Sequence, residues 1–546
     1  MLYSTAGLIL IALMAAAVPE ESGRDDASKK IDPQLTEWLA GTNSATIPVI
    51  VILKNDLRPD LTGFDVKYNY RLIHGLAGDA TYSSIERMAA SDAVLKVFLD
   101  NSAHLDISEN DSNGDGDIIP AQAINADELW SKGIDGKGVI VAVLDSGIDK
   151  NHPDLAGKVI GEKNFVEDEA SADDILGHGT MVAGIIAGSG AASNGKYKGI
   201  APGASLLNVK VINSKGDGKI SDIIAGIEWA LYNGADVMSL SLGGINLGET
   251  NPPITMAADN AMDQGVVVVV AAGNRNNTKT SGAAGTNSAQ AIDSKFPIEI
   301  SQIKNDQKKD VLYLLVPIVL ALPPGLIDSP GDGVKVITLG SSDYNGRIAE
   351  FSGSGPTRDD RTKPDVVAPG VNIISTAPPG LERPDYIDVY YARESGTSLS
   401  TPVAAGLAAL LLSENSNMTP AGIKAIMTRG AQKLHNTLGE EYEEYYQGTG
   451  LLDAVRSHEM LSEDICGAVP DRWIAGRWAY LPAGKGLYVG LDAGADRPQK
   501  KLYALAPGDE DWTNRFVFFC NAEKKDVTTS VSGTISDWIS LQALPS

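Results

Sequence analysis

Three short segments of the 546-residue chain carry side chains whose types and order suit nucleophilic catalysis. Asp145 lies in VLDSGI, His178 in GHGT and Ser398 in GTSLSTP. A serine hydroxyl is a weak nucleophile at neutral pH, and a histidine within hydrogen-bond reach activates it by removing its proton. A buried carboxylate then holds the imidazole in one tautomer and stabilises its protonated form. The residues therefore indicate Ser398 as nucleophile, His178 as general acid and base, and Asp145 as the orienting carboxylate.

Each segment taken alone has a plainer explanation. An aspartate at the end of a strand often forms a turn or caps a helix, and a serine at the start of a helix is most often its N-cap. A histidine between glycines is more often structural. The combination favours catalysis, because all three local contexts occur in the chain order Asp, His, Ser, which one group of catalytic triads uses.

Strands and helices alternate around these segments, which predicts a parallel sheet covered by helices on both faces. In this architecture functional side chains gather at the carboxyl ends of the strands, where Asp145 and Asn274 lie. Thr419 is the expected N-cap of one helix, with Pro420 at its first position, and Ser221 is the expected N-cap of another. The expected strands cover residues 139–145, 205–212, 236–244, 266–274 and 334–342, and the expected helices cover residues 179–188, 221–234, 254–265, 395–414 and 419–431.

From about Ile124 to Ala454, the chain resembles the subtilisin-like serine proteases. The segments that carry the resemblance occur in the family's order: DSGID, HPDL, GHGTMVAG, GIAPGA, MSLSLGG, VVAAGN, FSGSGPT, KPDVVAPG and GTSLSTPVAAG. The resemblance implies a three-layer α/β domain with a parallel sheet over residues 124–460, with an insertion at about 279–330. It also implies a serine endopeptidase that forms an acyl-enzyme on Ser398, acts on proteins and peptides as a monomer, and needs no cofactor for its chemistry.

The same resemblance assigns residues that bind the substrate. Asn274, in AAGN, matches the family's oxyanion-hole asparagine, and the backbone N–H of Ser398 would be the second donor. Ser241, Leu242 and Gly243 would form an open strand edge, on which a peptide substrate pairs as an added strand. The insertion lies in a part of the chain that helps wall the specificity pocket in this family, so we expect it to modify substrate access.

Two segments suggest a structural calcium ion. Asp154, in HPDL, matches a calcium ligand of the family, although the loop at residues 192–195 that would supply its partners departs from the usual pattern. Separately, residues 108–122 match part of an EF-hand loop, with Gln122 where the bidentate glutamate normally stands. A solvated acidic linker over residues 108–123 explains this segment as well. The candidate ligands in it are Asp111, Asn113, Asp115 and Asp117.

Residues 46–107 form a separate unit by their pattern. A strand-like run opens the unit, a helix with Ser83 or Ser84 as N-cap follows, and another strand closes it, which predicts a small α+β module. The module resembles the inhibitor-like propeptide of the subtilisin-like proteases. The resemblance implies a zymogen, in which the chain's own propeptide blocks the cleft as an intramolecular inhibitor until self-cleavage between about Asp100 and Ala121.

Residues 1–22 contain an apolar run from Leu8 to Val18 that includes small residues near its end, as in an export signal. No lysine or arginine precedes the run, so an uncleaved anchor is an alternative. The expected location is secreted or at the cell surface. The formal net charge of −25 argues against a nucleic-acid-binding protein, which needs a positively charged surface to bind the phosphates.

Two further regions have open interpretations. The apolar run in the insertion is broken by Pro317 and Pro323, which favours a buried insertion over membrane contact. Residues 462–546 are rich in Trp, Tyr, Val and Gly with turn signals, which predicts a small β domain. Its Cys466 and Cys520 could form one disulfide or stay as two buried thiols.

Two other functions fit the same sequence. A catalytically silent binding protein could keep the fold, but the intact set of Asp145, His178, Ser398 and Asn274 argues against it. A specialised processing protease or peptide ligase would use the same residues, so the sequence does not separate it from a general protease.

Overall fold

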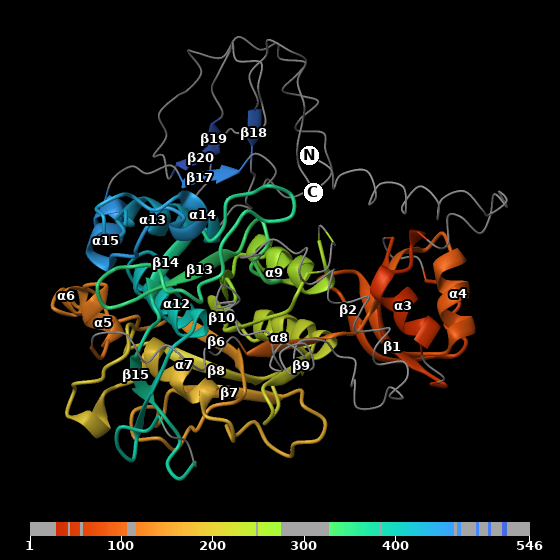
Figure 1. The fold of residues 1–546 in the computed structure, drawn as a ribbon, viewed down its shortest axis with the longest axis horizontal. Coiled ribbons are helices and arrows are strands. Elements are labelled where there is room, and N and C mark those ends of the chain that lie inside the picture. Colours follow the sequence, from red (N-terminus) through yellow and green to blue (C-terminus); the bar gives the residue numbers. More distant parts are fainter. Residues whose placement is uncertain are drawn as a thin grey trace, which may run out of the picture. The chain divides into compact units, whose positions relative to one another are not determined.

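The computed structural model divides into two compact units, residues 1–100 and 101–546 (Figure 1). The predicted export signal, the insertion as far as residue 326 and the side chains of Cys466 and Cys520 lie outside the described residues. The structure describes residues 29–41, 44–54, 58–105, 116–246, 249, 251–274, 327–381 and 385–462, and the backbone of four strands at 467–470, 488–490, 501–503 and 516–520.

The first unit is a four-stranded antiparallel sheet in the order β2-β3-β1-β4, accompanied by helices α3 and α4. β1 is almost wholly buried because its sequence IPVIVIL is nearly all apolar and rich in β-branched residues. The N-cap of α4 is Thr81, two residues before Ser83 and three before Ser84, the predicted caps, and its side chain accepts from the N–H of Ser84. The elements are α3 (Pro33–Gly41), β1 (Ile47–Leu53), β2 (Phe64–Tyr70), β3 (Gly75–Ala80), α4 (Tyr82–Ala90) and β4 (Val94–Leu99).

The second unit is built on a seven-stranded sheet in the order β14-β13-β12-β10-β6-β8-β7, in which all neighbouring strands run parallel. Every residue of β10 and β12 is buried, as expected for strands that are covered on both faces. The strands are β6 (Ile140–Asp145), β7 (Val159–Asn164), β8 (Ser205–Lys210), β10 (Val237–Leu240), β12 (Val267–Ala271), β13 (Ile337–Ser342) and β14 (Val366–Pro369).

Helices cover both faces of this sheet, which gives the three layers that the sequence predicts (Figure 1). α7 and α12 share one hydrophobic core with Val143 of β6 and Val269 of β12. Leu144 points to the opposite face, where it lies close to Gly226 of α8. The helices are α5 (Pro120–Ala123), α6 (Asp127–Trp130), α7 (His178–Ala187), the 3-10 helix η1 (Ala191–Ser193), α8 (Ile220–Tyr232), α9 (Pro253–Asp263), α12 (Thr397–Glu414), α13 (Pro420–Gly430), α14 (Glu444–Gln447) and α15 (Ala454–Ser462).

A small antiparallel sheet, β11-β5-β9, also belongs to the second unit. In it Leu242 lies opposite Leu105, and Gly243 lies opposite His104. The edge that the sequence assigns to the substrate is therefore paired with a segment of the chain itself. The strands are β5 (Ser102–Leu105), β9 (Asp217–Lys219) and β11 (Leu242–Gly243).

The remaining strands pair in two further sheets. β15 and β16 form a two-stranded antiparallel sheet that leads into α12, and β17-β20-β19-β18 form the small β region predicted near the C-terminal end of the sequence. Among the described helices, none is long and apolar enough to cross a membrane. The strands are β15 (Ile373–Thr376), β16 (Tyr391–Glu394), β17 (Gly467–Pro470), β18 (Tyr488–Gly490), β19 (Lys501–Tyr503) and β20 (Phe516–Cys520).

Candidate active site

Asp145 and His178 form a buried hydrogen-bonded pair. Asp145 is the last residue of β6, and His178 is the first residue of α7. The Nδ1 atom of His178 lies 2.8 Å from Oδ1 of Asp145, and the two side chains are 0% and 1% exposed. A carboxylate at this distance keeps the proton on Nδ1 and leaves Nε2 as the nitrogen that can accept one. The structure therefore joins two of the predicted catalytic residues.

Close packing around this pair requires glycine at two positions. Gly147 has a φ of 110°, and a Cβ on it would lie 2.5 Å from the carbonyl oxygen of Ala172. A Cβ on Gly179 would lie 2.1 Å from the carbonyl oxygen of Gly147 and 3.1 Å from Cβ of Asp145. The glycines of DSGI and GHGT therefore allow α7 to approach the end of β6 closely enough to form the pair.

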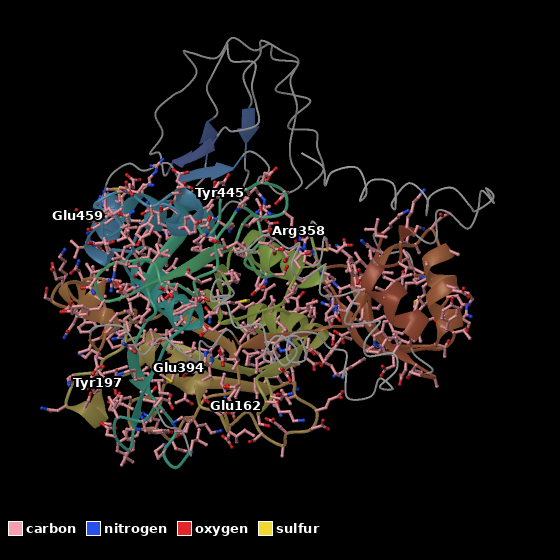
Figure 2. The ribbon with its side chains drawn as sticks, viewed as in Figure 1. Glu162, Tyr197, Arg358, Glu394, Tyr445 and Glu459 are labelled. Atoms are coloured by element: carbon pink, nitrogen blue, oxygen red, sulfur yellow. The ribbon has the colours of Figure 1, made fainter. Side chains whose placement is uncertain are left out.

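Burial and nearby carboxylates together set the charge state of His178. Burial disfavours the imidazolium, but the charge and hydrogen bond of Asp145 outweigh it, and Glu394 and Asp174 act in the same direction as Asp145. The pKa of His178 is therefore raised above its usual value. Glu394 ends β16, shortly before the segment that carries Ser398 (Figure 2). A raised pKa makes the neutral imidazole a stronger base, which suits proton removal from a serine.

Ser398 is the second residue of α12 and is fully buried. Its carbonyl oxygen accepts from Oγ of Ser241 at 2.7 Å. Ser241 follows β10, the parallel neighbour of β6, so Ser241 and Asp145 hold equivalent positions on adjacent strands. Adjacent strands lie about 4.8 Å apart. Ser398 and the Asp145–His178 pair are therefore tethered to neighbouring strand ends.

The two atoms that would exchange a proton are both available for it. Within the described part of the chain, Oγ of Ser398 and Nε2 of His178 are buried and make no hydrogen bond. Catalytic hydrogen bonds are often long without substrate and shorten when the substrate binds. The arrangement thus leaves a hydroxyl donor and an imidazole acceptor without competing partners.

Asn274 follows β12 at the same edge of the sheet. Its Oδ1 accepts from the backbone N–H and from Oγ1 of Thr397, at 3.0 and 2.9 Å. With Oδ1 held in this way, the Nδ2 group is the donor that Asn274 can offer. Thr397 precedes Ser398 in α12, so the amide lies beside the candidate nucleophile, as an oxyanion donor must.

The strand at Leu242 and Gly243, predicted as the substrate-binding edge, lies on one side of β5, and β9 lies on the other. β5 lies between them, and the N–H of Leu105 donates to the carbonyl oxygen of Gly216 at 3.1 Å. Sequence reasoning singled out the strand at Leu242 and Gly243 but not β9. The stretch SKGDGK is typical of a turn, and its pairing with a distant segment leaves no local signal.

The predicted calcium ligand Asp154 is engaged in protein hydrogen bonds. Its Oδ1 accepts from the N–H of Ala192 at 2.8 Å, and its Oδ2 accepts from the hydroxyl of Tyr391 at 2.8 Å. The described residues contain no group of three or more His, Cys, Asp or Glu side chains that could hold a metal ion. Asp111, Asn113 and Asp115 lie outside the described residues, and Oδ1 of Asp117 pairs with Arg393 at 2.5 Å.

Sequence reasoning also missed three charged residues near the pair, of which Asp174 and Lys210 are buried and Glu169 has a side chain that is 14% exposed. Asp174 and Glu169 belong to the connection between β7 and α7, and Lys210 is the last residue of β8. Charged residues in a connection are ordinarily solvated, and a lysine at a strand end is ordinarily exposed. Only their low exposure in the folded structure marks them as part of the site.

The chain is similar in sequence to known proteases. The model of the Subtilase family matches residues 136–450. The chain is 38% identical to Serine protease AprX of Bacillus subtilis (strain 168) over 336 residues, which cover 57% of this chain and 66% of AprX. It is 30% identical to Subtilisin E of the same organism over 436 residues, 80% of this chain and 91% of Subtilisin E. It is 34% identical to the Major intracellular serine protease of that organism over 297 residues, 54% of this chain and 74% of that protein. The chain therefore belongs to the subtilase family of serine endopeptidases.

Proposed function

We propose that this protease hydrolyses peptide bonds through an acyl-enzyme on Ser398, with His178 as general acid and base and Asp145 as the orienting carboxylate. The observation that carries the proposal is the buried 2.8 Å contact between His178 and Asp145 at the sheet edge to which Ser398 is tethered. Asn274, anchored beside the nucleophile, is proposed as an oxyanion donor.

In the acylation step, Oγ of Ser398 attacks the carbonyl carbon of the scissile bond while Nε2 of His178 takes its proton. The oxyanion accepts hydrogen bonds from Nδ2 of Asn274 and from the N–H of Ser398 at the start of α12. His178 then gives the proton to the leaving amine. In the second step, water attacks the ester carbonyl carbon while Nε2 of His178 takes a proton from the water. His178 then gives this proton to Oγ of Ser398 as the ester bond breaks, and the acid product leaves.

Protein and peptide substrates are proposed to bind as a strand between β11 and β9. The support is β5, a segment of ordinary polypeptide that pairs with both strands in antiparallel register. Pairing through backbone groups does not depend on side-chain identity, so we expect broad tolerance of sequence in the substrate.

A zymogen is proposed from the same pairing. Residues 102–105 lie where a substrate strand would bind, and the register runs from Leu105 toward Ser241, whose Oγ holds the carbonyl of Ser398. We therefore propose self-cleavage shortly after Leu105, within the range that the sequence predicts. The unit before this point would act as an intramolecular inhibitor until it is removed.

Export is proposed from the apolar run at residues 8–18, with a secreted monomer as the working form. Cells that express the full chain should then release activity into the medium. Activity that stays with the cells would count against secretion.

A structural calcium ion is proposed at the segment that carries Asp111, Asn113, Asp115 and Asp117, on the spacing of these side chains. A chelator is expected to lower the Tm of the wild type, because an ion that binds only the folded state stabilises it. The Tm of the variant Asp111→Asn/Asp115→Asn should be close to that of the wild type with chelator, and the chelator should not lower it further. If the Tm of the wild type does not respond to the chelator, the calcium site is wrong.

Self-processing tests the proposed catalytic roles and the zymogen together. Intact-mass measurement of the wild type is expected to show loss of roughly the first hundred residues, whereas Ser398→Ala stays whole, because only the wild type has the nucleophile. A variant that loses the same segment as the wild type would show that another protease cleaves it. In that case the nucleophile has to be identified by direct labelling.

A further inference from the structure

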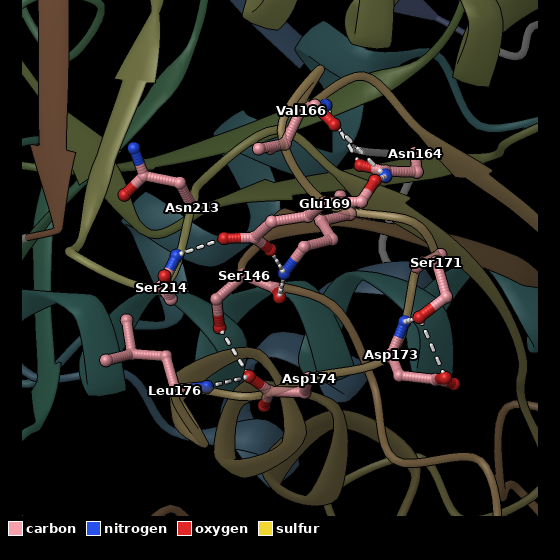
Figure 3. Close-up of polar contacts among 12 residues, drawn as sticks. Ser146, Asn164, Val166, Glu169, Ser171, Asp173, Asp174, Leu176, Asn213 and Ser214 are labelled. Carbon is pink, nitrogen blue, oxygen red and sulfur yellow. Dashed lines mark hydrogen bonds and ion pairs between the residues drawn. The ribbon is translucent and has the colours of Figure 1, made fainter.

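The connection between β7 and α7, residues 165–177, is held by polar contacts of its charged side chains, several of which Figure 3 shows. It carries Glu169 and Asp174, and both carboxylates point back toward the sheet edge at which Asp145 ends β6. Asp174 bonds directly to Ser146, the residue that follows Asp145, whereas Glu169 is connected to Ser146 through Lys210. The contacts of Ser146 are therefore the starting point.

Ser146 is fully buried and bonds in several directions. Its N–H donates to Oδ1 of Asp145 at 2.7 Å, the same oxygen that accepts from His178. Its Oγ donates to Oδ1 of Asp174 at 2.9 Å and accepts from the N–H of Gly179 at 2.9 Å. Ser146 thus links the carboxylate that orients the imidazole to the first turn of the helix that carries it.

Asp174 holds the start of α7 from the other side. Its Oδ1 accepts from the N–H groups of Leu176 and Gly177, at 3.1 and 2.7 Å. Its Oδ2 accepts from the N–H and the hydroxyl of Thr180, at 2.8 and 2.7 Å. A carboxylate in this place satisfies N–H groups that a helix start leaves without partners, and its charge suits the positive end of the helix dipole.

Lys210 completes the network from the sheet. It lies opposite Asp145 on the neighbouring strand, its side chain is 0% exposed, and its Nζ donates to the carbonyl oxygen of Ser146. Nζ also lies 2.9 Å from Oε2 of Glu169, whose Oε1 accepts from the N–H of Ser214 at 2.7 Å. Burial raises the pKa of Glu169, but the bonds from Lys210 and Ser214 outweigh it, so its pKa is lowered and it stays ionised beside Lys210.

We propose that Lys210, Glu169 and Asp174 are positioning residues for the reaction. Together they form a clamp on Ser146: Asp174 binds its hydroxyl, and Lys210, held by Glu169, binds its carbonyl oxygen. The clamp thereby fixes the length and angle of the Asp145–His178 hydrogen bond. The inference rests on the proposed roles of Asp145 and His178. It follows from the sensitivity of catalysis to geometry, because a displacement of about 1 Å at a catalytic group can lower the rate by about a hundredfold.

The variant Lys210→Met/Glu169→Gln tests the clamp. It removes the donor to Ser146 together with the charge that Lys210 neutralises, so no unpaired ion is left in the interior. Its kcat is expected to fall about tenfold, with KM changed by less than about twofold, because the clamp acts on the reacting groups and not on the substrate strand.

The pH profile gives a second readout. Burial lowers the pKa of His178, but Asp145 and, more weakly, Glu394 and Asp174 raise it, so it stands above its usual value. Catalysis needs the neutral imidazole, so kcat/KM falls as the pH drops through this raised pKa. A looser bond to Asp145 moves the pKa back toward its usual value, and the acid limb of the variant shifts to lower pH. The double variant loses one positive and one negative charge, so its net charge is that of the wild type. The shift of the acid limb therefore reports the geometry of the Asp145–His178 hydrogen bond.

Lys363→Met is the matched control. Lys363 is also buried, and its Nζ bonds Oδ2 of Asp365 at 2.7 Å and Oγ1 of Thr338 at 2.7 Å, while Asp365 keeps Lys424 as a partner. The control should lower thermal stability but keep kcat and the acid limb of the wild type.

Three outcomes separate the possibilities. A lowered kcat and a shifted acid limb in Lys210→Met/Glu169→Gln, with neither change in the control, would support the clamp. Wild-type values in both variants, or equal losses in both, would overturn it. A wild type that hydrolyses the peptide without reacting at Ser398 would instead refute the proposed function, which distinguishes the two failures.

Discussion

Replacing Ser398 by alanine is expected to lower kcat about a millionfold, the scale measured for loss of the nucleophile in a subtilisin. The physical reason is that alanine offers no atom to form the acyl-enzyme, so only transition-state binding by the rest of the site remains. The measurement is hydrolysis of a chromogenic peptide by purified protein. For the variant, the propeptide has to be removed by an added protease, since the variant is expected not to remove its own.

Ser400→Ala is the matched control for this substitution. Ser400 lies on the same helix, is equally buried, and bonds the carbonyl oxygen of Ala368 through Oγ at 3.0 Å. Loss of one such hydrogen bond costs about 1 kcal/mol of stability and should leave kcat within a few-fold of the wild type. If Ser400→Ala were inactive and Ser398→Ala active, the nucleophile would be misassigned.

The second large effect is expected at Asn274. Asn274→Ala should lower kcat about 100- to 1,000-fold with little change in KM, the range found when one oxyanion donor is removed from a subtilisin. KM should stay nearly constant because the donor is used most strongly once the oxyanion forms.

Asn274→Asp separates the two contacts of this side chain. The carboxylate can still accept from Thr397, at the position where Oδ1 now lies 3.0 Å from its N–H, but it lacks the Nδ2 donor and adds a negative charge beside the oxyanion. We expect a loss of kcat at least as large as in Asn274→Ala. Near-normal activity in Asn274→Asp would mean that Asn274 serves to anchor α12 and not to bind the oxyanion.

The local sequence was sufficient to predict helix starts approximately, because the residues that cap a helix are adjacent to it in the chain. Thr419 was predicted as an N-cap followed by Pro420, and the side chain of Thr419 indeed accepts from the N–H of Gly422. For α8 the predicted cap Ser221 lies inside the helix, which starts after Lys219. Caps depend on the backbone angles at a single residue, so neighbouring polar residues compete and the position shifts by a residue or two.

The candidate catalytic pair was predictable for a different reason. Asp145 stands at the end of an apolar strand, and His178 stands between glycines at the start of an apolar helix, so both sequence contexts place them at the edge of the sheet. The glycines beside them are needed by the contact itself, as the close approach of Gly179 to Gly147 demonstrates.

Contacts between distant segments could not be predicted. The pairing of β5 with Leu242 and Gly243 joins segments far apart in the chain, and neither segment has a sequence pattern that identifies its partner strand. The ion pair of Lys210 with Glu169 could not be predicted either, because Glu169 lies in a connection whose composition is that of an exposed loop. At Asp154 a motif predicted a metal ligand, but its contacts with Ala192 and Tyr391 have no signal in the sequence.

The most direct test of Ser398 as nucleophile is to identify the residue that a fluorophosphonate probe modifies. Wild type and His178→Ala would be treated with the probe after removal of the propeptide, digested, and analysed by mass spectrometry. We predict one modified residue in the wild type, Ser398, and much slower modification in His178→Ala, because no base then activates the hydroxyl. Modification of a different serine, or no modification in a preparation that still hydrolyses peptides, would contradict the assignment.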